Sequence, residues 1–170
     1  RRPARLLVWF RDRDSKDNPY IQSQILTTMT KIVEIKNYSL EYQEAMRHFL
    51  DQLTSSPMTL TEEMFNQLLA SPNSHLFFLW KDEQIAGMLT VGIYYSPTGG
   101  KAWIEDVVVD ESFRGQGLSK LLVAHAIEFT KSKQIPTLML TSNPKRVAAN
   151  KLYQAMGFER KETNVYRMKF

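Results

Sequence analysis

The stretch SFRGQGLSKLL, residues 112–122, decides the fold. Two glycines, Gly115 and Gly117, stand one residue apart in a chain that has only seven. The apolar segment before them ends at Val109, and apolar residues at helical spacing begin just after Gly117. We therefore expect a strand, a glycine-rich turn and a helix from Gly117 to about Lys133, in that order.

The turn before this helix is a candidate anion site. The first N–H groups of a helix have no partner within the helix, and the helix dipole adds positive charge at the same end. Glycines let the backbone approach a diphosphate closely, and the Arg114 side chain can add a charge-assisted hydrogen bond. The alternative is a plain strand-to-helix connection without a ligand.

Two stricter nucleotide-binding motifs are excluded at this turn. A P-loop needs lysine and then serine or threonine directly after its last glycine, and GQGLSK lacks that order. A dinucleotide fingerprint needs a glycine or alanine where Lys120 stands. It also needs an acidic residue near the end of the next strand, and TLMLTS (137–142) has none.

The composition of the chain indicates one globular domain. Of 170 residues, 43% are apolar and 24% are charged, and there is no cysteine. A disulfide scaffold, a thiolate metal site and a cysteine nucleophile are therefore excluded. No apolar run approaches the roughly 18 residues of a membrane helix, and LLVWF (6–10) is too short for a secretory signal. We expect a cytoplasmic protein with no membrane partner.

Residues 1–28 differ from the rest of the chain. They hold six of the 22 basic and three of the 18 acidic residues, so the remainder is nearly neutral, with 16 basic and 15 acidic residues. A nucleic-acid partner is therefore not expected. We expect an N-terminal extension that need not be native, either a cloning remnant or upstream sequence before a natural start at Met29. A regulatory or partner-binding arm is the alternative, and one domain follows over 29–170.

The first half of that domain predicts a strand, two helices and a meander. KIVEIKNY (31–38) alternates as a strand, and SLEYQEAMRHFLDQL (39–53) has helical spacing with Ser39 as its cap. A second helix is expected over 59–70, with Thr59 and Glu62 as a capping box. Apolar runs over 75–80, 84–95 and 102–110 are separated by turn residues and predict antiparallel strands.

The second half predicts two more helices. After the helix at Gly117 we expect a buried strand over 137–142 and a helix over 144–157, with Pro144 in its first turn and Gly157 at its end. Two short strands then close the chain. The order is β-α-α-β-β-β-α-β-α-β-β, a mixed α/β (α+β) single domain with six or seven strands.

The motif RGQGLS (114–119), together with ANKLYQAMGF (149–158), resembles the GNAT superfamily of acetyl-CoA-dependent N-acetyltransferases. The likeness covers roughly residues 31–170 and implies that family's mostly antiparallel sheet, splayed at its two central strands. The family pattern is Gln or Arg, two residues, Gly, one residue, then Gly or Ala, and it falls on Arg114, Gly117 and Ser119. Ser119 departs from it; since serine is only slightly larger than alanine, we expect binding to survive, at reduced affinity if its N–H must approach a phosphate. IEDVVVDESFRGQGLSKLL (104–122) is also similar to aminosugar-phosphate acetyltransferases.

The resemblance implies acetyl-CoA as co-substrate and no metal. The backbone of the strand ending at Val109 would hold the pantetheine arm in the splayed cleft, while the valine side chains fill the core. Asn143 has an alternative role as a helix cap. Lys120 and Arg146 are candidates for the 3′-phosphate, with solvated surface cations as the alternative. The residues implied in donor binding are Val107, Val108, Val109, Arg114, Gly115, Gln116, Gly117, Leu118, Ser119, Asn143, Asn150 and Tyr153.

Acetyl transfer to an amine needs a base for the ammonium proton and an acid for the departing thiolate. By the resemblance, Tyr153 is the acid; its alternative is a core aromatic with a solvated hydroxyl. Glu105 is the candidate base, directly or through water. Strand alternation predicts that its neighbour Asp106 points to the opposite face of the sheet. For either carboxylate, the alternative is a solvated or ion-paired strand residue.

The three histidines predict neither a metal site nor a nucleophile partner. His48, His75 and His125 lack a second histidine or acidic residue at metal-ligand spacing. His125 shares an apolar helical stripe with Leu122 and Phe129, which predicts a half-buried, hydrogen-bonded side chain. No G-x-S-x-G is present, so a serine nucleophile is unsupported.

The sequence therefore predicts an N-acetyltransferase that moves an acetyl group from acetyl-CoA to a primary amine of a small molecule, by direct attack in a ternary complex. Residues 52–64 and 159–168 flank the cleft in this fold and would select the amine. The alternatives are a protein or peptide N-acetyltransferase, and a non-catalytic coenzyme A binding module of the same fold. A homodimer is left open.

Overall fold

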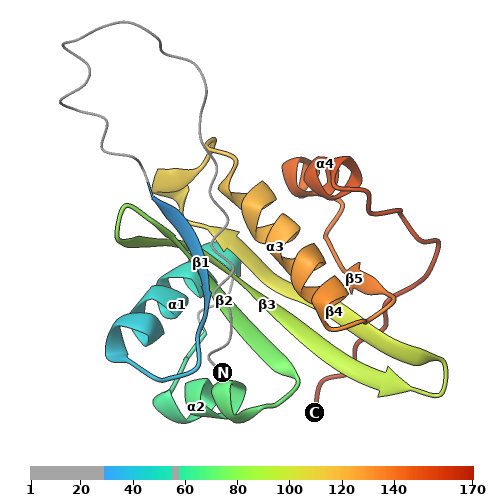
Figure 1. Cartoon of the computed structure of the whole chain (residues 1–170), viewed down its shortest axis with the longest axis horizontal. Helices are drawn as coiled ribbons and strands as arrows, with labels where there is room; N and C mark the ends of the chain where they lie inside the picture. Colours follow the sequence, from blue (N-terminus) through green and yellow to red (C-terminus); the bar gives the residue numbers. More distant parts are fainter. Residues whose placement is uncertain (1–28, 55–57) are drawn as a thin grey trace, which may run out of the picture.

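The structure, a computed structural model, describes residues 29–54 and 58–170. The expected extension over 1–28 lies outside the described residues. The order of elements (Figure 1) is β1 (Thr30–Glu34), α1 (Leu40–Leu53), α2 (Glu62–Ala70), β2 (Ser74–Lys81), β3 (Gln84–Ser96), β4 (Gly99–Val109), η1 (Glu111–Phe113), α3 (Leu118–Ser132), β5 (Leu138–Leu140) and α4 (Val147–Ala155).

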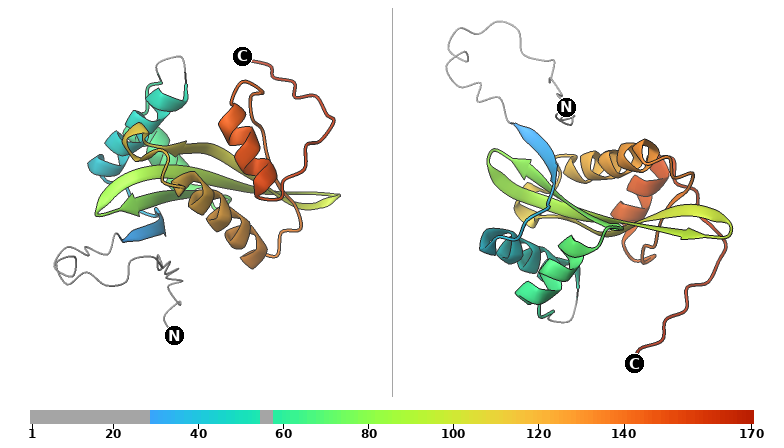
Figure 2. Two further views of the ribbon diagram at one scale, coloured as in Figure 1. Left: turned by 90° about the horizontal axis from the view of Figure 1, so that it is seen from above. Right: turned by 60° about the horizontal axis from the view of Figure 1, so that its bottom comes forward.

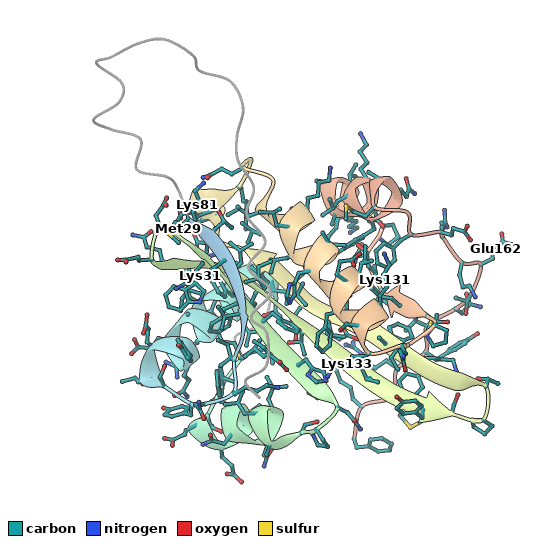
Figure 3. All side chains as sticks on the ribbon, in the orientation of Figure 1. Met29, Lys31, Lys81, Lys131, Lys133 and Glu162 are labelled. Carbon is teal, nitrogen blue, oxygen red and sulfur yellow. The ribbon has the colours of Figure 1, made fainter. Side chains whose placement is uncertain are left out.

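The strands form one sheet in the order β1-β2-β3-β4-β5. The first four pair antiparallel and β5 joins β4 in parallel, which confirms the meander and the mixed α/β class. The β2–β3 reversal is tight because Asp82 and Glu83 both have positive φ, 48° and 66°. Figure 3 shows Met29 and Lys31 beside Lys81, where β1 begins against the end of β2.

Helices cover both faces of the sheet. Figure 2 shows α1 and α2 on one face and α3 on the other. On the α1 face, Phe49, Phe65 and Phe78 form the centre of one core cluster, each at most 1% exposed. On the α3 face, Leu89 and Leu122 belong to a second cluster. The sheet is thus buried on both sides, which explains why β2 and β3 are almost continuously apolar.

Of the starts of α1, α2 and α4, the first lies where the sequence predicts and the other two differ from the prediction. Ser39 caps α1 as predicted, because its hydroxyl accepts the Tyr42 N–H at 3.1 Å. The cap of α2 is Thr61, whose side chain accepts from Met64 N–H, so the expected Thr59 box is wrong. Pro144 lies in a turn three residues before α4 instead of in its first turn.

The two strands predicted to close the chain are wrong for the described residues, since no strand follows β5. Val165, Tyr166 and Met168 are at least 73% exposed, so their alternation finds no apolar face to pack on. β5 itself is only three residues long. Among residues 29–54 and 58–170, no helix combines the length and apolarity needed to cross a membrane.

Candidate active site

The glycine turn lies between η1 and α3, as the sequence predicts. Gly115 and Gly117 have φ of +78° and +75°, a region that residues with a Cβ rarely adopt. A Cβ built at either position would meet no atom within 4 Å. The two glycines are therefore required by the backbone conformation, and the space beside them is open.

The start of α3 leaves N–H groups unpaired. Gly117 is the N-cap and has no side chain to accept a hydrogen bond. The Gly117 carbonyl accepts from the N–H of Lys120 at 3.0 Å and of Leu121 at 3.3 Å. The earlier N–H groups, of Leu118 and Ser119, belong to the first turn, which has no acceptor within the helix. This end of α3 therefore presents amide donors and a positive dipole to an anion.

Arg114 stands at the entrance to this turn with its guanidinium partly engaged. Its Nε donates to Val109 O at 3.4 Å, and its Nη2 donates to Gln52 Oε1 at 3.1 Å. The side chains of Arg114, Gln116 and Lys120 are exposed. Since a guanidinium carries five N–H donors, Arg114 keeps others for a ligand.

The edge of β4 beside the turn is open toward β5. The parallel pairing covers only Ala102–Ile104 against Leu138–Leu140, so the stretch from Glu105 to Val109 has no strand partner on that side among the described residues. This agrees with the splay that the family resemblance implies. Backbone groups of an unpaired edge can accept a ligand as an added strand would.

A β-bulge interrupts β4 at the candidate carboxylates. Thr90 pairs with Glu105 but Met88 pairs with Val108, so Asp106 and Val107 together oppose Leu89. Asp106 has φ of +51°. The simple alternation predicted for Asp106 is therefore broken.

The bulge changes which face of the sheet the following valines occupy. Ile104 packs in the α3-face cluster, and after the bulge Val107 and Val109 pack there too, whereas Val108 packs in the α1-face cluster. Regular alternation from Ile104 would have placed Val108 on the α3 face. Glu105 shares the α1 face through its partner Thr90, which pairs in turn with Leu76 of the α1-face cluster.

Both carboxylates of the bulge are harder to ionise than usual. Desolvation raises the pKa of Glu105, and the charge of Asp106 raises it further. Desolvation also raises the pKa of Asp106, while the charge of Arg146 partly opposes that rise. Both side chains remain accessible to solvent. A carboxylate with a raised pKa is closer to the range in which it can take a proton.

Tyr153 lies on α4, half-buried, with its ring 6.0 Å from that of Phe158. Burial raises the pKa of Tyr153, and Arg146 partly opposes that rise. Arg146 thus acts electrostatically on both Tyr153 and Asp106, which places α4 near the bulge. Its Nη2 also donates to Leu53 O at 2.8 Å, joining the start of α4 to the end of α1.

The side chains of the two asparagines predicted to contact the donor are engaged with backbone groups of the turn before α4. Asn150 Nδ2 donates to Asn143 O and to Arg146 O, both at 2.9 Å. Asn143 Oδ1 accepts the Lys145 N–H at 2.9 Å, so Asn143 shapes the turn before α4 rather than capping the helix itself. Their contact with the donor stays a prediction.

The histidines make long-range contacts that spacing did not indicate. His48 Nε2 lies 2.5 Å from Asp110 Oδ2, and His75 Nδ1 lies 2.6 Å from Glu34 Oε1. The Nε2 of His125 is buried without a hydrogen-bond partner in the described structure, so the expected hydrogen-bonded side chain is wrong. Within 29–54 and 58–170, no group of three or more acidic or histidine side chains is arranged to hold a metal ion.

Asp110, the residue just after β4, lies at the candidate site but was not predicted from the sequence. It is 8% exposed, and its carboxylate accepts from Ser112 N–H at 2.8 Å and from Gln52 Nε2 at 2.9 Å. Burial alone would raise the pKa of Asp110, but hydrogen bonds from Ser112, Gln52 and His48 outweigh burial and hold it well below its usual range. Only its position at the end of an apolar strand could have drawn attention to it.

Comparison with known proteins decides the family. Residues 41–158 match the acetyltransferase (GNAT) family. The chain belongs to this family. As a GNAT protein it is an acyltransferase, and its fold and glycine turn are those that the sequence motif predicted.

The proteins similar to this GNAT chain carry varied names. Glucosamine 6-phosphate N-acetyltransferase of Trypanosoma brucei brucei is 32% identical over 143 residues, covering 79% of this chain and 95% of that protein. A solved structure named transcriptional regulator from Bacillus halodurans C-125 is 27% identical with a TM-score of 0.69, covering 84% and 100%. Aminoglycoside N-acetyltransferase AAC(6')-Iy in complex with CoA is 20% identical with a TM-score of 0.67, covering 84% and 95%.

Proposed function

We propose that this protein transfers the acetyl group of acetyl-CoA to the primary amine of a small molecule, by direct attack within a ternary complex. One observation carries the proposal: a glycine turn with unpaired helix amides adjoins an open strand edge that leads to Glu105. The diphosphate would bind at Gly115–Ser119 with Arg114, and the pantetheine arm along 107–109. Along an extended coenzyme the diphosphate, the pantetheine arm and the thioester follow one another in this same order.

In the chemical step, Glu105 accepts a proton from the ammonium, directly or through a water molecule. The neutral amine attacks the thioester carbonyl, a C–N bond forms, the C–S bond breaks, and Tyr153 gives its proton to the thiolate. The attacking nitrogen loses its second proton to water as the amide forms, and water returns a proton to the Tyr153 phenolate. The Tyr153 phenol carries its proton at neutral pH, since its ordinary pKa of 10.0 already lies well above 7 and burial raises that pKa further. The raised pKa of Glu105 likewise makes it a stronger base than an ordinary carboxylate.

An aminosugar phosphate is the first acceptor to test. The trypanosomal relative is named for acetylation of glucosamine 6-phosphate and shares 32% identity over 95% of its length, and this supports the choice. A protein or peptide amine is the second acceptor class. A coenzyme A binding module without turnover is the alternative outside enzymes, and the likeness to a transcriptional regulator favours including it in the test.

The test is an amine panel that contains glucosamine 6-phosphate, aminoglycosides, polyamines, amino acids and peptide N-termini. With acetyl-CoA, we expect release of free coenzyme A with at least one small amine. Tyr153→Phe should lower kcat by about 10²-fold, since a general acid contributes about 10²–10⁴, while coenzyme A binding is retained. Binding of coenzyme A with no turnover on any amine would contradict the enzyme and support the binding module.

A further inference from the structure

We infer that Gln52, near the end of α1, is a positioning residue for the donor site: it fixes Arg114 and the loop before α3 in the arrangement that binds the diphosphate. This rests on the proposed function. Gln52 is separated from Arg114 by 62 residues in sequence, and neither the glycine motif nor any spacing points to it.

The first step of the argument is the double use of the Gln52 amide oxygen. Gln52 Oε1 accepts from the Glu111 N–H at 3.1 Å and from Arg114 Nη2 at 3.1 Å. One oxygen therefore holds both the backbone of η1 and the guanidinium at the glycine turn. Since Arg114 also donates to Val109 O, its side chain is fixed between the end of β4 and α1.

The second step is what fixes Gln52 itself. Its Nε2 donates to Asp110 Oδ2 at 2.9 Å, and the same carboxylate oxygen lies 2.5 Å from His48 Nε2. The other oxygen of Asp110 accepts the Ser112 N–H. Asp110 is buried and carries all these contacts, so it sets which end of the Gln52 amide faces Arg114.

The third step is the expected consequence for binding. A long arginine side chain and a loop with two left-handed glycines lose much conformational freedom when a ligand orders them. Contacts that order them beforehand reduce that loss, so they should strengthen donor binding. The reacting atoms lie elsewhere, at the bulge and α4, so the turnover of bound donor should change little.

The experiment compares Gln52→Met with a matched Gln67→Met. Gln67 is exposed on α2, and its Nε2 donates to Glu63 Oε1 at 3.4 Å. By calorimetry with coenzyme A we expect Gln52→Met to raise Kd about tenfold, on the order of one charged hydrogen bond, and Gln67→Met to leave Kd unchanged. The KM for acetyl-CoA should rise with Kd, while kcat at saturating donor stays within about twofold.

A double-mutant cycle separates positioning from a general loss of structure. In an Arg114→Met background, Gln52→Met should raise Kd by clearly less than the tenfold expected in the wild-type background, because Arg114, one of the two groups that Gln52 holds, is gone while the contact with the Glu111 N–H is lost in both backgrounds. Asp110→Asn gives a third arm, with the same direction of change as Gln52→Met. If Asp110→Asn does not fold, the Gln52→Met variant and the double-mutant cycle with Arg114→Met still test whether Gln52 positions the donor site.

Failures of this inference and of the proposed function are distinct. Wild-type Kd with Gln52→Met, or an equal effect of Gln52→Met in both backgrounds, overturns the inference and leaves the proposed function standing. Normal coenzyme A binding without turnover overturns the proposed activity, while the change in Kd still tests Gln52. Absence of any heat with the wild-type protein overturns the donor site and the inference together.

Discussion

Two helices, α3 and α4, follow the two strands of the parallel pair, and they are held very differently. α3 follows β4 and buries Leu118, Leu122, Val123, Ala126 and Thr130. α4 follows β5 and has no fully buried residue. Its contacts with the rest of the described structure include the Arg146 bond to Leu53 O and the partly buried side chains around Tyr153. In the proposed enzyme the diphosphate end is therefore rigid, and the end with the acid opens more readily.

The largest test of this comparison is truncation of one leucine on each helix. Leu122 is 0% exposed, so Leu122→Ala should lower the free energy of unfolding by about 3 kcal/mol, as for other buried leucines. Leu152→Ala on α4 removes only partly buried surface and should cost about 1 kcal/mol. Urea denaturation measures both, and equal losses would contradict the difference between the helices.

A second test changes the backbone at the start of α3. Gly117→Ala forces a Cβ into positive φ, which costs about 1–2 kcal/mol for such a residue. The turn should relax and coenzyme A should bind about tenfold more weakly. Gly92→Ala is the matched control, since Gly92 also has open space beside it but no positive φ. Calorimetry on both variants checks the result, and equal affinities would show that this conformation is not needed.

A third test acts on α4 through Arg146. Burial raises the pKa of Asp106 and of Tyr153, and the Arg146 guanidinium opposes that rise. Arg146→Gln removes the opposing charge and should therefore raise both pKa values further. The acid limb of the kcat/KM profile should then move to higher pH, by less than about one unit, if Asp106 contributes to activity. Lys145→Gln, one residue earlier on the exposed turn, is the control. An unmoved acid limb would leave Glu105 as the only carboxylate of the bulge to titrate in catalysis.

The smallest effect is expected at His125 on α3, whose buried Nε2 has no hydrogen-bond partner within the described residues. Desolvation lowers the pKa of His125 from its ordinary 6.5, so as pH falls below that value the unfolded chain takes up the proton first. The contribution of neutral His125 to stability is therefore fully present above pH 6.5. It is lost as the pH falls from 6.5 toward the pKa of His125 in the folded protein. His125→Phe should remove that loss and add at most about 1 kcal/mol at neutral pH. Thermal melts between pH 5 and 8 measure the difference.

The features that sequence predicted are local. Gly115 and Gly117, the cap at Ser39 and the meander each depend on neighbouring residues, and the structure contains them. The bulge was not predictable, since IEDVVV shows no glycine or proline to mark where alternation fails. Gln52 and Asp110 meet across 58 residues, a contact that only the folded sheet creates. The closing strands were wrongly predicted because alternation alone does not supply an apolar face.

The bulge at Asp106 also sets a length constraint on this part of the chain. Because β4 has one extra residue between Ile104 and Val108, the valines 107–109 lie on the opposite sides from those that regular alternation would give. Val107 and Val109 therefore pack in the α3-face cluster, and Val108 packs in the α1-face cluster. Removing Asp106 alone would restore regular pairing and keep the three valines on their present sides, whereas adding one further residue would send Val107 and Val109 into the layer of Phe49 and draw Val108 out of it. Evolution can therefore vary the chemistry of Glu105 and Asp106 by substitution, or lose the extra residue, but lengthening this strand would mean repacking both halves of the molecule at once.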